Sequence, residues 1–167
     1  MLIHSILFAA LAYASALTVL AGDVPLIPRD VLFGNPERAG VQLSPDGTQI
    51  SFLAPVDGVL NVWIQSREGG EARAVTASVD RPITSYTWAI NGEQILYSQD
   101  KGGNENTHVY SVDLASGNTT DLTPGDGVRA SIMGGNRDRP DEVLIQTNGR
   151  DPAAMDVLNL NTRSGET

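Results

Sequence analysis

The chain contains no cysteine among its 167 residues, and Lys101 is its single lysine. The absence of cysteine excludes a disulfide framework, a zinc site built from thiolates and a thiol nucleophile. The 11 basic residues face 20 acidic ones, which gives a net charge of −9. Nucleic-acid binding needs patches of Lys and Arg that neutralise phosphates, so this balance argues against a nucleic-acid partner. The acidity instead indicates a well-solvated surface.

Aromatic residues are also scarce, at 5% of the chain, whereas glycine occurs 17 times. This combination fits a protein rich in turns better than a helical one. The hydrophobic content of 41% is enough for a packed core. A chain of this length forms one domain or part of one.

Charged residues are missing from the first 22 positions, and residues 2–20 are almost wholly apolar. Small residues around Ala21 suit cleavage, so we predict a secretory signal peptide over residues 1–22. Because this segment has no Lys or Arg at its start, a membrane anchor over residues 2–22 is the alternative. In both cases the folded part, beyond Asp23, is expected outside the cytoplasm. A cysteine-free domain there suits a periplasmic or secreted protein.

Residues 23–40 are expected to form an extended segment that leads into the folded part, because Pro25 and Pro28 disfavour helix before them. A block of short strands and turns then begins. Ser44-Pro45-Asp46-Gly47 has the residues that a type I turn prefers. The predicted strands of this first copy are Val41–Leu43, Gln49–Ala54, Asn61–Gln65 and Ala72–Thr76.

The same order of strands and turns recurs twice more. In the second copy Asn91-Gly92 forms the hairpin turn, with Gly92 in the left-handed region. Its predicted strands are Ser85–Ala89, Gln94–Ser98, Thr107–Asp113 and Thr119–Thr123. The third copy is looser, because Met133-Gly134-Gly135-Asn136 interrupts it. Its predicted strands are Ser131–Gly134, Glu142–Thr147 and Asp156–Leu160.

The repeat has a period of about 45 to 48 residues, as corresponding glycines such as Gly47 and Gly92, or Gly117 and Gly165, show. Four short strands in a unit of this length are typical of a β-propeller blade. We therefore predict an all-β fold, an incomplete β-propeller of about three four-stranded blades, preceded by the signal segment. The predicted propeller spans residues 41–167, with blades at about 41–77, 85–124 and 130–167. A β-sandwich with regular turns is the alternative.

The third copy stops one strand short at Thr167. Known propellers have about four to eight blades, so three units do not close a ring. We expect the chain to be part of a longer propeller, or a short protein that completes a ring by self-association. Open blade faces and unpaired edges would otherwise favour aggregation.

The run from Ile27 to Gly47 resembles the start of the propeller of serine peptidases of the prolyl oligopeptidase family. The group it resembles is the secreted dipeptidyl aminopeptidase or acylaminoacyl peptidase type. The resemblance continues at residues 54–63, 99–106 and 139–144. It covers essentially all of the chain beyond the signal segment. Many propellers outside the cytoplasm share the Ser-Pro-Asp-Gly turn, but the run through Asn35-Pro36-Glu37-Arg38 is more specific.

The resemblance implies a two-domain enzyme, in which the propeller caps a C-terminal α/β-hydrolase domain with a Ser-Asp-His triad. The implied role of the propeller is to gate access, so that short peptides reach the catalytic domain and folded proteins do not. The implied partners are peptide substrates and the hydrolase domain, which we expect outside this chain. The alternative is a TolB-like periplasmic propeller that acts as a protein-binding module without a hydrolase.

The sequence offers no catalytic residue, no cofactor-binding residue and no metal ligand that we can name. The Gly-x-Ser-x-Gly motif of a nucleophile elbow is absent. Of the two histidines, His4 lies in the signal segment, and His108 is expected to pack or form hydrogen bonds locally on a strand. We predict this chain to be inactive by itself.

Several other polar or aromatic residues have a structural and a functional interpretation. The loop with Asp100, Asn104, Glu105 and Asn106 lacks the ligand spacing of an EF-hand calcium site, so we interpret it as a solvated hairpin loop. Trp63 and Trp88 are expected to pack between blades, with a stacking platform for a ligand as the alternative. Asn118-Thr119-Thr120 matches a glycosylation sequon. The remaining charged candidates are read as turn or surface residues: Asp121 and Asp126 at a blade connection, and Arg137, Asp138, Arg139 and Asp141 as ion pairs on a surface loop.

Overall fold

The computed structural model describes residues 26–33 and 37–167. The predicted signal peptide or anchor lies outside these residues. None of the helices in the described part is long and apolar enough to cross a membrane. The chain divides into two units, residues 1–35 and 36–167, which are described separately.

In the first unit, residues 26–33 are described and include a short helix, α1 (Arg29–Phe33), where the sequence predicted an extended segment. That prediction is wrong for these residues. Pro28 immediately precedes the helix, where proline is tolerated because its fixed φ suits a helix start and its missing N–H is not needed. The Pro28 carbonyl accepts hydrogen bonds from the backbone N–H groups of Val31 (3.1 Å) and Leu32 (3.3 Å).

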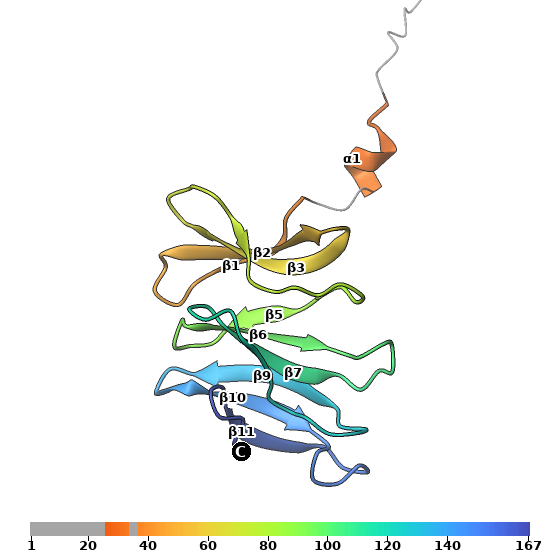
Figure 1. The fold of residues 1–167 in the computed structure, drawn as a ribbon, viewed down its shortest axis with the longest axis vertical. Helices are drawn as coiled ribbons and strands as arrows, with labels where there is room; N and C mark the ends of the chain where they lie inside the picture. Colours follow the sequence, from red (N-terminus) through yellow and green to blue (C-terminus); the bar gives the residue numbers. More distant parts are fainter. Residues whose placement is uncertain (1–25, 34–36) are drawn as a thin grey trace, which may run out of the picture. The chain divides into compact units, whose positions relative to one another are not determined.

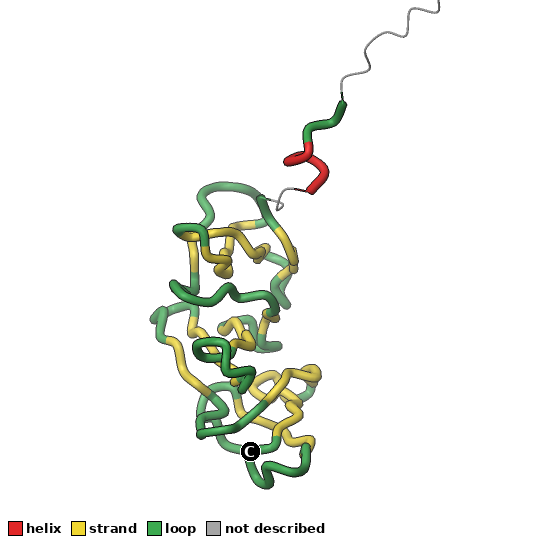
Figure 2. Tube along the Cα trace, turned by 90° about the vertical axis from the view of Figure 1, so that its right-hand side faces the viewer, coloured by secondary structure: helices red, strands yellow, loops and turns green. Residues whose placement is uncertain are grey.

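The second unit consists of three antiparallel β-sheets that follow one another along the chain (Figures 1 and 2). The first contains β1 (Ala39–Leu43), β2 (Gln49–Val56), β3 (Val59–Ser66) and β4 (Arg73–Ala74). The second contains β5 (Tyr86–Trp88), β6 (Gln94–Gln99), β7 (His108–Asp113) and β8 (Thr119–Asp121). The third contains β9 (Ala130–Asn136), β10 (Arg139–Thr147) and β11 (Asp156–Asn161).

Strands within each sheet pair in the order in which the chain makes them. This up-and-down order in successive sheets is that of propeller blades. The predicted all-β class is confirmed, and the third sheet has three strands among the described residues, as the sequence indicated.

The turn between the first two strands of a blade is the same in the first and second sheets. The Ser44 N–H donates to the Gln49 carbonyl (2.9 Å), and the Gly47 N–H donates to the Ser44 carbonyl (2.8 Å). In the second sheet the Ala89 N–H donates to the Gln94 carbonyl (2.9 Å), and the Gly92 N–H donates to the Ala89 carbonyl (3.0 Å). Gly47 and Gly92 have φ of 72° and 74°, a left-handed conformation that glycine adopts without strain.

Asp46 stabilises the first of these turns through its carboxylate. That group accepts hydrogen bonds from the hydroxyl of Ser44 (2.6 Å) and from the backbone N–H (3.0 Å) and hydroxyl (2.8 Å) of Thr48. The Ser44 hydroxyl and both Thr48 groups favour the charged carboxylate, and they lower the pKa of Asp46 to about 2. The Ser-Pro-Asp-Gly motif thus makes a turn whose acidic residue is satisfied locally.

A threonine after the last strand holds that strand to its neighbour in both four-stranded sheets. The Thr76 hydroxyl accepts a hydrogen bond from the Val62 N–H (2.8 Å), and the Thr123 hydroxyl accepts one from the Val109 N–H (2.9 Å). The strands β4 and β8 are only two and three residues long. These side-chain bonds therefore extend the pairing beyond the short outer strands.

Two hydrophobic clusters fill the spaces between successive sheets. The first includes Leu53 and Val62 from the first sheet with Ile95 and Val112 from the second. The second cluster joins the opposite face of the second sheet to the third sheet. Its buried members are Ala89, Leu96, Val109, Leu122, Ala130, Val143, Ile145 and Leu160. Both faces of the second sheet are therefore buried, as in a blade that has neighbours on both sides.

The hairpin between β9 and β10 is tighter than the sequence predicted. We expected residues 135–141 to form a loop, but β9 continues to Asn136, and Arg139 already begins β10. Irregular register allows this pairing, with shifts between Arg139 and Val143 and between Leu144 and Ile145. Such bulges permit pairing around a proline, here Pro140, which has no N–H to donate.

Candidate functional site

His108 lies at the start of β7 and contacts Asp121 at the end of β8. Its Nδ1 atom is 2.7 Å from Asp121 Oδ2, and the imidazole stacks on Tyr110 with ring centroids 6.2 Å apart. Asp121 also accepts a hydrogen bond from the Thr123 N–H (3.0 Å). His108 thus forms the local hydrogen bond that the sequence predicted for it. Asp126 is exposed in the connection that follows β8.

Asp100 in the loop between β6 and β7 accepts hydrogen bonds from its own loop and from Arg81. The Glu105 N–H donates to its carboxylate (3.2 Å), and this backbone bond is the largest cause that lowers the pKa of Asp100. Arg81 contacts the other carboxylate oxygen at 2.9 Å. Asn104 accepts a bond from the Asn106 N–H (3.0 Å). Among the described residues, no group of three or more His, Asp or Glu side chains is arranged to hold a metal ion.

The two tryptophans lie in different environments. Trp88 is only 6% exposed and belongs to the cluster between the first and second sheets. Its Nε1–H donates to the Ser51 hydroxyl in the first sheet (2.7 Å), so its predicted packing between blades is confirmed. Trp63 pairs with Phe52 on the opposite face of the first sheet, is half-buried and donates to the Ala54 carbonyl (3.0 Å). Trp63 therefore does not pack between the three sheets that the structure describes, and its packing against a further blade stays a prediction.

The charged residues near the third copy do not pair as predicted. Arg139 contacts Glu142 (3.2 Å), and Asp141 contacts Arg163 (2.9 Å), so neither pairs within the expected group of Arg137, Asp138, Arg139 and Asp141. Arg139 and Asp141 also lie in strand β10 and not in a surface loop. The expected pairing was wrong because the pairing of β10 with β11 places Asp141 beside Thr162, where the turn after β11 begins.

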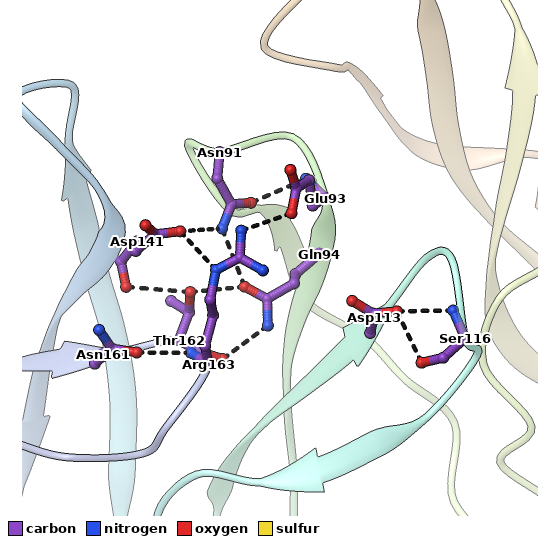
Figure 3. Close-up of polar contacts among 9 residues, drawn as sticks. All are labelled: Asn91, Glu93, Gln94, Asp113, Ser116, Asp141, Asn161, Thr162 and Arg163. Carbon is purple, nitrogen blue, oxygen red and sulfur yellow. Dashed lines mark hydrogen bonds and ion pairs between the residues drawn. The ribbon is translucent and has the colours of Figure 1, made fainter.

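Asp141 belongs to a polar network that joins the second sheet to the third (Figure 3). Its Oδ1 atom accepts from the Asn91 amide (2.9 Å) and from Arg163 Nε (2.9 Å). Arg163 also contacts Glu93 through Nη2 (2.6 Å). These charged side chains are about half exposed, at 47% for Arg163, 61% for Glu93 and 46% for Asp141. Ion pairs of such exposure contribute little stability by themselves.

The buried part of the network is a reciprocal bond between Gln94 and Thr162. The Gln94 Nε2–H donates to the Thr162 carbonyl (2.8 Å), and the Thr162 hydroxyl donates to Gln94 Oε1 (2.7 Å). The exposed fractions are 4% for Gln94 and 1% for Thr162. Buried bonds of this kind stabilise because the groups, once removed from water, are costly to leave unpaired. This pair therefore fixes the junction of the second and third sheets.

Acid is expected to weaken this junction through Asp141. The Asn91 amide and Arg163 hold the pKa of the Asp141 carboxyl below its ordinary value. Because the folded pKa is the lower one, the stabilisation is complete above the unfolded pKa and is lost as the pH falls through the folded pKa. Urea unfolding at several pH values, with Asp141→Asn as the comparison, measures this. We expect the difference in unfolding midpoint between the two proteins to shrink as the pH falls from about 5 to about 3. A difference that does not change with pH would contradict the prediction.

A groove of about 270 Å³ lies beside this junction, between the first strands of the second and third sheets. One wall is formed by Thr87 and Trp88 of β5 and the following Ile90. The other wall is formed by β9, with Met133 and Gly134. The remaining lining includes Leu96, Val143 and the carboxylate-bearing Glu142. The groove therefore combines apolar side chains with polar surface, including one acidic side chain.

Two adjacent residues of β9 beside the groove, Gly134 and Gly135, have no side chain. Gly134 pairs with Leu144, so a Cβ atom at Gly134 would lie on the outer face of the third sheet, where it would meet nothing within 4 Å. A Cβ atom at Gly135 would lie 2.7 Å from Ile90 Cγ1, so glycine is required where β9 approaches the second sheet. The sequence prediction treated this glycine pair as an interruption of the repeat. Two consecutive glycines within a strand are the sequence signal that another part of the chain approaches the strand closely there, or that a space opens beside it.

The three sheets and the inter-sheet contacts define the class of this protein as a β-propeller, of which the described residues form three successive blades. A solved structure of TolB from Acinetobacter baumannii matches this fold with a TM-score of 0.55 and 13% identity, over 80% of this chain and 31% of that one. No protein-family model matches the chain.

Two curated relatives show what the chain is homologous to. Dipeptidyl aminopeptidase BIII from Pseudoxanthomonas mexicana is 46% identical over 158 residues, which are 94% of this chain and 23% of the relative. Dipeptidyl peptidase family member 6 from Caenorhabditis elegans is 31% identical, over 90% of this chain and 21% of the relative. The chain is therefore homologous to the propeller portion of the dipeptidyl peptidase family, and the predicted resemblance is confirmed. It spans between a fifth and a quarter of the length of these two relatives.

Proposed function

We propose that this chain is the propeller part of a secreted serine peptidase of the prolyl oligopeptidase family. In this role it gates the access of short peptides to an α/β-hydrolase domain. The observation that carries the proposal is the 46% identity to dipeptidyl aminopeptidase BIII over 94% of this chain. The chain itself contains no Gly-x-Ser-x-Gly motif, so the nucleophile is assigned to a separate domain.

The fold supports a gating role in physical terms. Two buried clusters and the Gln94–Thr162 bonds hold successive sheets together as rigid layers. A rigid ring of such layers excludes folded proteins by size and admits extended chains. We expect export through residues 1–22, with retention as an anchor over residues 2–22 as the alternative.

The test compares this chain with the protein encoded by its complete reading frame. We expect that frame to continue to a Gly-x-Ser-x-Gly motif. The complete protein should react with a fluorophosphonate probe and release dipeptides from nitroanilide substrates, but leave folded proteins intact. Residues 1–167 alone should neither react with the probe nor release dipeptides. A complete frame without that motif would overturn the peptidase assignment. Mass spectrometry of the exported protein shows whether residues 1–22 are removed.

A TolB-like binding module is the second candidate, favoured by the TM-score of 0.55 to TolB over 80% of this chain. This likeness is at 13% identity and concerns the fold alone. The candidate predicts a frame that ends after further blades, and a protein that is captured by a partner and does not react with the fluorophosphonate. The same experiment therefore separates the two functions.

A further inference from the structure

We propose that the free edge of β9 and the groove beside it bind an extended peptide by strand addition. The inference rests on the proposed peptide-gating function, and it names the surface and the mode by which the propeller would hold the peptide. It depends on three observations: an unprotected strand edge, a bulge that exposes a methionine, and an adjacent empty groove.

The first observation is the character of the β9 edge. Among the strands of the described part of the chain, β9 lies at the end of its sheet and pairs with β10 alone. It has seven residues, against five in β1 and three in β5, and none of the seven is charged or proline. Edge strands are normally protected against pairing by shortness, charge or proline. The outer edges of the first and second sheets follow this rule, because β4 has two residues, with Arg73, and β8 has three, with Asp121. The third sheet ends on β11, which has six residues and begins with a charged one, Asp156.

The second observation is a bulge in β9. The register passes from the pair Ile145 and Ile132 to the pair Leu144 and Gly134, so Met133 is an extra residue without a partner on β10. Bulges are frequent beside functional sites, where they redirect a side chain. Met133 is 55% exposed and lines the groove. Methionine is a flexible side chain that adapts to different apolar ligands.

The third observation is the space next to this edge. The groove has a volume of about 270 Å³ and lies along Met133 and the backbone of Gly134 on one side and Thr87 on the other. A peptide paired with β9 therefore has room for an apolar side chain. Affinity in strand addition comes from main-chain hydrogen bonds, and specificity comes from pockets for alternate side chains.

The charge around the groove sets the class of peptide. Glu142 is the charged residue in its lining, and its side chain remains 30% exposed beside Arg139. The chain as a whole carries a net charge of −9. An extended peptide with an apolar side chain at the groove and without acidic residues fits this environment. An aspartate placed in the groove would lie next to Glu142 and bind more weakly.

The experiment titrates residues 1–167 with a blocked peptide, acetyl-Lys-Thr-Val-Thr-Val-amide. Binding is followed by tryptophan fluorescence, since Trp88 lines the groove, and by NMR shifts of backbone amides. We expect the largest shifts at residues 131–135. The same peptide with its central amides N-methylated keeps its side chains but loses donors, so it should bind at least about tenfold more weakly. The peptide with Asp in place of the central Val should also bind more weakly.

A matched pair of variants tests the groove. Met133→Ala removes the exposed side chain that lines the groove, and it should weaken binding by about tenfold with an unchanged unfolding midpoint. Met155→Ala removes an exposed methionine from the loop between β10 and β11, away from the groove, and should leave binding unchanged. If Met133→Ala lowers the midpoint, the affinity of the unaltered chain for the N-methylated peptide tests the inference instead.

Three results would overturn the inference. These are the absence of binding at millimolar peptide, shifts that centre on another strand, and equal affinity for the N-methylated peptide. Hydrolysis by the protein from the complete frame is measured separately. A peptidase whose propeller does not bind this peptide would therefore refute strand addition and leave the proposed function intact.

Discussion

Replacing Gln94 with alanine lowers the free energy of unfolding by about 2 kcal/mol, because the Thr162 carbonyl loses its buried donor. The donor and acceptor of Gln94 both bond across the junction of the second and third sheets, at 2.8 and 2.7 Å. The Thr162 hydroxyl retains a longer contact with the Asp141 carbonyl (3.2 Å), which limits the loss. Urea unfolding of residues 1–167, followed by tryptophan fluorescence, measures the change.

The repeat supplies a matched control for this variant. Gln49 occupies the same position in the first sheet, since Gln49 and Gln94 each close the same turn. Its buried Oε1 atom has no hydrogen-bond partner within residues 26–33 and 37–167. Gln49→Ala removes an unpaired group and should cost less than about 1 kcal/mol. Equal losses for the two variants would show that Gln94 stabilises through packing and not through its bonds to Thr162.

Trp88→Ala should be the most destabilising single change, at about 3 to 5 kcal/mol, because it opens a cavity in a packed cluster. Trp88 is 6% exposed and joins the first two sheets through its ring and through its bond to Ser51. Trp88→Phe keeps most of the apolar volume and removes the indole N–H, so it should cost about 1 kcal/mol. Urea midpoints of the two variants separate packing from hydrogen bonding.

Trp63→Ala is the control for the loss of a tryptophan as such. Trp63 is half-buried on the other face of the first sheet and contributes to neither of the two clusters. We expect a loss of about 1 to 2 kcal/mol, in proportion to the smaller area that it buries. A loss as large as that of Trp88→Ala would contradict the assignment of the two faces.

The two tryptophans also show which features could be predicted from the sequence and which could not. Both were correctly placed on strands, because short apolar runs between turns predict strands. The face on which each side chain lies depends on register, and a shift of one residue moves a side chain to the other face. Trp63 lies between Val62 and Ile64, which are both buried against the second sheet. Only the pairing of β2 with β3 shows that Trp63 points the other way.

The contacts of the polar network were beyond sequence reasoning for a related reason. Arg163 contacts Glu93, 70 positions earlier, and Asn91 contacts Asp141, 50 positions later. A charged residue on a surface loop has many acceptors within reach, and local sequence does not choose among them. The pairing of β10 with β11 places Asp141 beside Thr162 and Arg163, and that register was not predicted.

The sequence by itself determined the class of fold, the period of the repeat and the positions of most strands. It could do so because these features depend on local chemistry: the turns need Gly, Pro, Asp or Asn, and the strands between them need alternating apolar residues. The family also followed from local runs such as Ile27 to Gly47. Tertiary structure alone decided which faces are buried, which distant residues bond across a junction, and where a groove remains open. Those features depend on register and on the approach of whole sheets, as when Gly135 in β9 meets Ile90 beside β5.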